Sequence, residues 1–329
     1  DYNEGGMLAI TATVEQGGSP YSLQSQPARM SVYPLLYNIL VAPLSRVFGA
    51  TLELHRLVAA LFILACCAII FYVCRKELVA RTESFAAATL LYAGLLYYST
   101  PIASPNSLGL FLFLSAIIIP WVYGFSKRSL CTAIIVGILA FYTKQYFIAC
   151  LGYIAFYLFL AESKKRAMAF GLASLAAFIV AMIFVSYTSP YYFDNTFFAV
   201  QSVSKIASSY AHLITQFKEY TLTYIPLLII LAAWSVQKCY SRIFSSTQQV
   251  QNLQEKKLVS FADMDAPLLL QKPNYIWICC TCSILIIVAS LGRNAGNHLT
   301  YFFQLISPFL LAGIFALISD MPKWLWSIR

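Results

Sequence analysis

The sequence predicts an all-α polytopic membrane protein, and three observations support this class. Hydrophobic residues make up 60% of the 329 residues, and charged residues make up only 11%. The mean hydropathy of +0.72 is too high for a domain whose whole surface faces water. Nine apolar segments approach the length of roughly 20 helical residues that a bilayer core of about 30 Å requires. They cover approximately residues 57–74, 84–99, 107–124, 130–143, 146–161, 167–187, 221–237, 275–291 and 303–319.

Three parts of the chain need a separate interpretation. Residues 32–49 are apolar, but two prolines, an asparagine and an arginine interrupt them, so we expect a helix on the outer membrane surface with Tyr33 and Tyr37 at the interface. The short segments on either side of Lys144 are either two spans or one broken helix. Residues 238–274 are rich in Gln, Ser and Lys and predict a flexible cytoplasmic loop.

The distribution of basic residues predicts the orientation, because Lys and Arg are retained on the cytoplasmic side of short loops. Fifteen of the 22 basic residues fall on alternate loops, and seven fall on the others. The cytoplasmic groups are Arg75, Lys76 and Arg81; Lys127 and Arg128; Lys164, Lys165 and Arg166; the stretch 238–272; and Lys323 with Arg329. This assigns residues 1–55 to a first outer region and residues 56–329 to a membrane domain, with further outer loops at 188–220 and 292–302. Basic residues in such short groups indicate topology and no nucleic-acid partner.

An odd number of spans with a cytoplasmic C-terminus leaves Asp1 outside, although the start of the chain does not resemble a signal peptide. Because Asp1 is also not a methionine, we expect one further span upstream that acts as a signal anchor. The nine cysteines lie in or beside apolar segments and suggest small buried side chains, so we expect neither disulfides nor a zinc site.

Polar residues that are costly to keep near lipid gather on the predicted outer side. Asp1 and Glu4 are two carboxylates within four residues, and either can deprotonate an acceptor or bind a divalent cation. The alternative for each is a solvated loop carboxylate or a charge at a helix N-terminus. Arg56 and Lys144 stand at outer ends of apolar segments, where they either hold a phosphate or extend to the interface. His55 either helps Arg56 to bind phosphate or has a structural role.

The last outer loop, residues 292–302, is dense in hydrogen-bonding groups. Arg293 and His298 are candidates for binding phosphate or pyrophosphate, and Asn297 and Tyr301 for binding sugar hydroxyls. An ordinary glycine turn is the alternative. The aromatic residues of the loop 188–220 form either a platform for a ligand or a lid that packs on the membrane. No Walker loop, dinucleotide fingerprint, nucleophile elbow or zinc-protease motif is present.

Several of these motifs together resemble membrane glycosyltransferases of the GT-C superfamily, in the bacterial branch of protein O-mannosyltransferases and the lipid A aminoarabinose transferase. They are Asp-x-x-Glu-Gly at residues 1–5, Pro-x-x-Tyr at 34–37 before Phe48-Gly49, His-Arg-Leu at 55–57, Thr143-Lys144, and Asn297-His298-x-x-Tyr301 with Pro308. The chain departs from relatives that have an Asp-Glu pair where it has Asn3-Glu4, and an Asp in the turn Ser104-Pro105-Asn106.

The resemblance implies a cavity open to the outer leaflet and a large first outer loop with juxtamembrane helices. The donor is a polyprenyl-phosphate sugar, and the acceptor is a lipid, a glycan or a protein. Glu4 is the implied catalytic base, with Asp1 as the alternative and both as ligands of any divalent cation. The resemblance further implies that the donor phosphate is held by Arg56, Lys144, Arg293 and His298. It implies that the sugar or acceptor is contacted by Asn297, Tyr301, Gln145 and Tyr37.

The sequence therefore predicts inverting sugar transfer at the periplasmic face of a bacterial plasma membrane. Two other functions stay open at this point. A transporter or flippase of lipid-linked sugars uses the same outer basic residues without breaking a bond. An outer-face glycan polymerase or ligase also fits the Arg and His residues, but it requires a lipid pyrophosphate donor.

Overall fold

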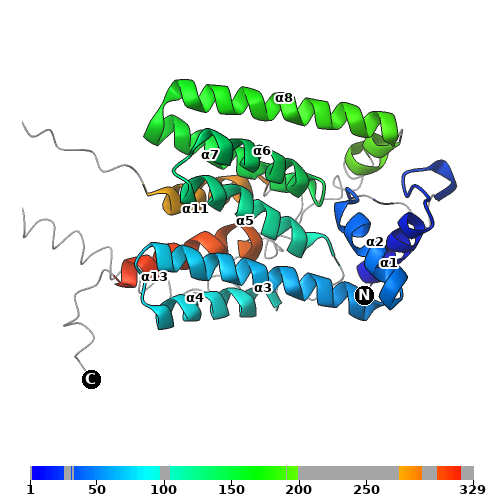
Figure 1. The fold of residues 1–329 in the computed structure, drawn as a ribbon, viewed down its shortest axis with the longest axis horizontal. Helices are drawn as coiled ribbons and strands as arrows, with labels where there is room; N and C mark the ends of the chain where they lie inside the picture. Colours follow the sequence, from blue (N-terminus) through cyan, green and yellow to red (C-terminus); the bar gives the residue numbers. More distant parts are fainter. Residues whose placement is uncertain are drawn as a thin grey trace, which may run out of the picture. The chain divides into compact units, whose positions relative to one another are not determined.

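The computed structural model describes residues 2–25, 31, 33–96, 104–189, 191–198, 274–290 and 302–319, all of which belong to one compact unit of residues 1–208 and 273–329. Helices are the only regular structure within these ranges, as predicted (Figure 1). The α-helices are α1 (Tyr2–Glu15), α2 (Leu36–Phe48), α3 (Leu52–Lys76), α4 (Arg81–Gly94), α5 (Asn106–Val122), α6 (Lys127–Phe141), α7 (Ala149–Tyr157), α8 (Lys164–Thr188), α11 (Tyr275–Ser290) and α13 (Ser307–Ser319). The 3-10 turns are η1 (Leu23–Ser25) and η3 (Gln145–Ile148), and the π turns are η4 (Leu158–Glu162), η5 (Asp194–Phe198) and η6 (Phe302–Ile306).

The predicted apolar segments coincide with helices wherever they fall on described residues. Residues 221–237 lie outside that part of the chain. Within the described ranges, three helical stretches are long and apolar enough to cross a membrane: Leu52–Lys76, Gln145–Glu162 and Lys164–Thr188. The second combines η3, α7 and η4, and the break before it at Lys144 separates it from α6. The described helices therefore support a membrane protein.

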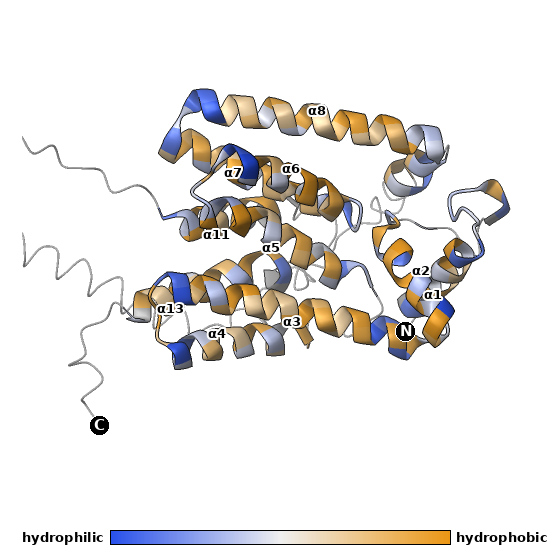
Figure 2. Ribbon diagram, viewed as in Figure 1, coloured by the Kyte–Doolittle hydropathy of each residue, from blue (hydrophilic) through white to orange (hydrophobic). Residues whose placement is uncertain are grey.

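Helix α8 has the surface expected of a helix that faces lipid. Figure 2 shows hydrophilic residues at its start and mainly apolar residues along the rest. Leu172, Val180 and Phe184 each expose about two thirds of their surface. Apolar side chains on an unpacked helix face are stable in hydrocarbon but costly in water.

Local sequence determines where several helices begin. Thr51 caps α3, because its side chain accepts a hydrogen bond from the Leu54 amide, and Ser126 caps α6 in the same way through the Ser129 amide. Gly124 has a φ of 58° in the tight turn between α5 and α6, a conformation that favours glycine. These signals fix the ends of the helices independently of their packing.

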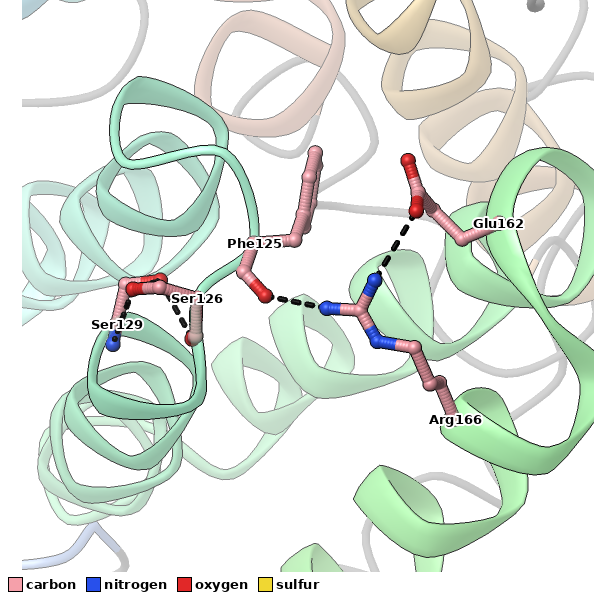
Figure 3. Close-up of polar contacts among 5 residues, drawn as sticks. All are labelled: Phe125, Ser126, Ser129, Glu162 and Arg166. Carbon is pink, nitrogen blue, oxygen red and sulfur yellow. Dashed lines mark hydrogen bonds and ion pairs between the residues drawn. The ribbon is translucent and has the colours of Figure 1, made fainter.

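Three of the five basic groups assigned to the cytoplasm fall on described residues, and their turns are joined at one end of the helices, which we call the basic end. The other two, the stretch 238–272 and Lys323 with Arg329, lie outside the described residues. Arg166 at the start of α8 donates to the Phe125 carbonyl in the α5–α6 turn and pairs with Glu162 at 3.0 Å (Figure 3). Lys76 at the end of α3 donates to the Val122 carbonyl at 3.1 Å. The alternation predicted from the sequence therefore brings these turns to a common end.

The core lies among α3, α4, α5, α7, α11 and α13. Phe113 of α5 is fully buried, and its ring centroid is 5.8 Å from that of Phe147, 5.5 Å from Tyr153 and 6.3 Å from Phe309. Gly109, one helical turn earlier, lies directly against Phe147 and has no space for a side chain. This close approach brings the start of α5 to the turn that carries Lys144.

The predicted outer region 1–55 contains two packed helices, α1 and α2. The Asn38 amide donates to Thr11 Oγ1 at 2.9 Å and to the Met7 carbonyl at 3.2 Å, and Ser45 donates to Glu15 at 3.0 Å. The predicted apolar helix in 32–49 is present as α2, which begins at Leu36. Glu4 lies in the first turn of α1, as in the alternative of a charge at a helix N-terminus.

Candidate functional site

Lys144 lies in a cradle of polar and aromatic side chains at the end of the helices opposite the basic end. Its Nζ donates to Asn106 Oδ1 at 2.9 Å and lies 4.9 Å from the ring centroid of Tyr33 and 5.4 Å from that of Tyr146. Burial lowers the pKa of the ammonium from 10.5 to about 8. Lys144 therefore remains mainly charged at neutral pH, and an anion that binds it raises its pKa again.

The local structure of residues 140–148 places the lysine in this cradle. Helix α6 ends at Phe141, the Thr143 hydroxyl donates to the Ala140 carbonyl at 2.6 Å, and Lys144 is extended with a φ of −159°. The chain then enters the 3-10 turn η3, whose Phe147 packs on Gly109. The side chain of Lys144 thus meets Asn106, the first residue of α5.

An apolar groove of about 540 Å³ lies beside this cradle, between the start of α2 and the second half of α8. Its walls include Leu36, Tyr142 and Phe184. The Leu36 amide donates to the Tyr142 carbonyl at 3.0 Å, and Tyr21, another wall residue, donates to the Tyr33 carbonyl at 2.7 Å. The segments that line the groove therefore continue directly into Tyr33 and Lys144.

Such an arrangement suits an amphipathic ligand. Most of the groove walls are aliphatic or aromatic, which favours an alkyl or isoprenoid chain. The side chain of Tyr192 is buried in the groove wall. The ammonium of Lys144 provides the attraction for an anionic head.

Glu4 and Arg56 form an ion pair between α1 and α3. Arg56 Nε donates to Glu4 Oε1 at 2.9 Å, and a terminal nitrogen donates to Oε2 at 2.6 Å. The Glu4 side chain is 2% exposed and that of Arg56 is 52% exposed. A guanidinium has five N–H groups, so Arg56 keeps donors for a ligand while the buried carboxylate fixes its orientation.

Both oxygens of Glu4 accept hydrogen bonds from Arg56, and this affects two of the predicted roles. Glu4 can remove a proton only after the ion pair opens. A divalent cation does not fit at a carboxylate whose two oxygens face a guanidinium, and the described residues contain no group of three potential metal ligands.

Tyr37 and His55 form a buried pair beside this ion pair. The Tyr37 hydroxyl donates to the His55 carbonyl at 3.0 Å, and both side chains are completely buried. Tyr37 was predicted to contact sugar or acceptor, and this is corrected, because its ring and its hydroxyl are used in packing α2 on α3. Both ring nitrogens of His55 lack a hydrogen-bond partner within the described part of the chain.

The predicted site residues thus fall into two clusters at this end. Lys144 belongs to the cradle, and Glu4 and Arg56 form the second cluster. Tyr33 belongs to the cradle, and Tyr37 packs beside the ion pair. Because only four positions separate these two residues, their Cα atoms lie within about 14 Å of each other. The amide of Gln145, predicted to bind sugar or acceptor, donates to the Thr196 carbonyl at 3.2 Å.

Five predicted residues lie outside the described residues: Asp1, Arg293, Asn297, His298 and Tyr301. The structure also adds residues that the sequence reasoning did not assign to the site. Asn106 and Tyr33 contact Lys144 directly, and Gln304 accepts a hydrogen bond from Tyr146. Of these three, only Asn106 could have been predicted from the sequence, because it stands in the turn where GT-C glycosyltransferases often have an Asp.

Searches of protein-family models, of curated proteins and of solved structures found no match to this chain. The resemblance to GT-C glycosyltransferases therefore stays a prediction that rests on the motifs.

Proposed function

We propose that this chain is an integral membrane glycosyltransferase that takes a sugar from a polyprenyl-phosphate donor. The observation that carries the proposal is the cradle of Lys144 beside an apolar groove of about 540 Å³. A polyprenyl-phosphate sugar needs both features, because its chain is apolar and its phosphate is anionic. The ion pair of Glu4 and Arg56 at the same end adds a carboxylate and a second cation.

In the proposed reaction an acceptor hydroxyl or amine attacks the anomeric carbon of the donor. The bond from this carbon to the phosphate oxygen breaks, and polyprenyl phosphate leaves with the bonding electrons. Lys144 and Arg56 neutralise the charge that develops on that oxygen. Glu4 accepts the proton of the acceptor once Arg56 has turned toward the phosphate, with Asp1 as the alternative base. Attack from the opposite face inverts the anomeric centre.

The proposed topology has nine spans in this chain and the site at the periplasmic face of a bacterial plasma membrane. Two features support it. The basic turns gather at one end of the helices, while Glu4, Arg56 and Lys144 lie at the other. Cationic turns are typical of the cytoplasmic side.

The decisive experiment measures binding of farnesyl phosphate and transfer from labelled polyprenyl-phosphate sugars with the purified full chain in detergent. We expect Lys144→Gln to weaken farnesyl phosphate binding by about 10-fold or more, since hydrogen bonds to charged groups contribute about 1.5–3 kcal/mol. Lys165→Gln is the matched control, because Lys165 is an exposed lysine in the first turn of α8 at the basic end. Equal binding by both variants, or no transfer from any such donor, rejects the proposal.

The same preparation tests the competing transport function. A flippase moves an intact lipid-linked sugar across a liposome membrane and releases no polyprenyl phosphate. Translocation without release of polyprenyl phosphate would show that the chain is a transporter and not a transferase. The groove and Lys144 would then still bind the lipid.

A further inference from the structure

A contact between residues distant in sequence adjoins the Lys144 cradle. The Tyr146 hydroxyl donates to Oε1 of Gln304, which is 158 positions away and completely buried. Gln304 lies in the middle of the π turn η6, directly before α13. Because α13 packs against α11, α3 and α4, the acceptor oxygen is attached to the core of the helical unit.

Tyr146 needs such an attachment more than a residue within a long helix does. It belongs to the four-residue 3-10 turn η3, and 3-10 hydrogen bonds have poorer geometry than those of an α-helix. Its neighbour Gln145 is held from the other side by the Thr196 carbonyl in the π turn η5. The two residues that follow Lys144 are therefore held by hydrogen bonds that they donate to two π turns.

The orientation of the Tyr146 ring matters because a cation interacts with the face of an aromatic ring and not with its edge. Within the described residues, the charged or titratable groups in contact with the Lys144 ammonium are the rings of Tyr33 and Tyr146. Asn106 supplies the acceptor oxygen. A change in the Tyr146 ring therefore alters one of the three supports of the cation.

We propose that Gln304 is a positioning residue that holds the Tyr146 ring against the Lys144 ammonium and so keeps this cation ready for the donor phosphate. The inference rests on the proposed function, since it assumes that Lys144 binds the phosphate. Gln304 does not touch the donor and acts through Tyr146.

The test compares Tyr146→Phe and Gln304→Met, which remove the donor and the acceptor of this hydrogen bond while keeping side chains of similar size. Farnesyl phosphate binding to the full chain in detergent is measured from pH 6 to pH 10. We expect each variant to raise Kd about three- to fivefold and to move the alkaline limb of the profile down by about half a pH unit, since a weaker cation–π contact favours the neutral amine. The double variant should bind no worse than either single variant.

Tyr275→Phe is the matched control. Tyr275 is a buried tyrosine at the start of α11, its hydroxyl donates to the Ile117 carbonyl at 3.0 Å, and its ring packs on Phe125 in the α5–α6 turn at the basic end. The control loses a similar buried hydrogen bond, so we expect lower stability but an unchanged pH profile. If Lys144→Gln leaves binding intact, the proposed function fails; if Lys144→Gln weakens binding but Tyr146→Phe and Gln304→Met leave the profile unchanged, only the positioning role is overturned.

Discussion

Gly109 has no space for a side chain, and this offers a direct test of the packing that builds the site. A Cβ at this position would lie 2.5 Å from Cδ2 of Phe147, and closer still to the ring atom Cε2 and to the Thr143 hydroxyl. Carbon atoms pack at about 3.5–4.0 Å, so Gly109→Ala requires the ring or the helix to move by about 1 Å. The affected residues are those that hold Lys144 beside Asn106.

The expected cost of Gly109→Ala follows from two opposing effects. Overpacking a close contact destabilises by about 1–3 kcal/mol, and the higher helix propensity of alanine returns up to about 1 kcal/mol. We therefore expect a net loss of about 1–2 kcal/mol. Because the shift separates Asn106 from Lys144, we also expect weaker binding of farnesyl phosphate.

The assay is thermal unfolding in detergent, followed by farnesyl phosphate binding. Gly152→Ala is the matched control, since Gly152 is also helical and a Cβ there meets no atom within 4 Å. The control should be as stable as the original chain or slightly more stable. Equal stability and equal binding for both variants would refute the close approach of α5 to the Lys144 turn.

Three further predictions concern the two clusters. His55→Leu should leave the free energy of unfolding unchanged or increase it, because both imidazole nitrogens lack a hydrogen-bond partner among the described residues. Tyr37→Phe should lower it by about 1 kcal/mol, because a buried hydrogen bond is lost. Chemical denaturation measures both changes. Arg56→Met should destabilise the original chain more than it destabilises a Glu4→Met variant, since it removes the guanidinium that donates to both oxygens of the buried Glu4 carboxylate, and additive losses in this double-mutant cycle would contradict the ion pair. The pKa of Lys144 is lower in the folded chain than its usual 10.5, so at this residue the unfolded state binds more protons between about pH 8 and pH 10.5, and its contribution to the free energy of unfolding should rise across that range. This contribution is measured as the difference in the free energy of unfolding between the original chain and Lys144→Met, and a difference that stays constant or falls with pH would show that the ammonium is not buried.

The helices could be predicted well because their signals are local. An apolar run marks each helix, and a basic group or a cap such as Thr51 or Ser126 marks an end. A helix after Tyr33 was also expected, although it begins only at Leu36. Apolar runs and caps act through neighbouring residues, so composition and spacing were sufficient to locate these helices, although the ends differ by several residues, as in α3, which was expected at 57–74 and runs from Leu52 to Lys76.

The candidate site could be predicted only in part. The sequence identified Lys144, Arg56 and Glu4 as unusual charges on one side of the chain. It assigned separate roles to Glu4 and Arg56, although they bind each other, and it placed Tyr37 at a ligand although the residue is buried. An ion pair and a buried ring depend on which helices touch, and one sequence does not contain that information in its periodicity.

The sequence by itself determined the helical class, the positions of the described apolar helices, three of which are long and apolar enough to cross a membrane, and which charged residues stand beside apolar segments. The tertiary structure decided the partners. Asn106 meets Lys144 across 38 positions, Arg56 meets Glu4 across 52, and Gln304 meets Tyr146 across 158. The physical reason is that hydrophobicity and helix propensity act over neighbouring residues, whereas a hydrogen bond between distant side chains forms only where close packing, as at Gly109, brings two helices together.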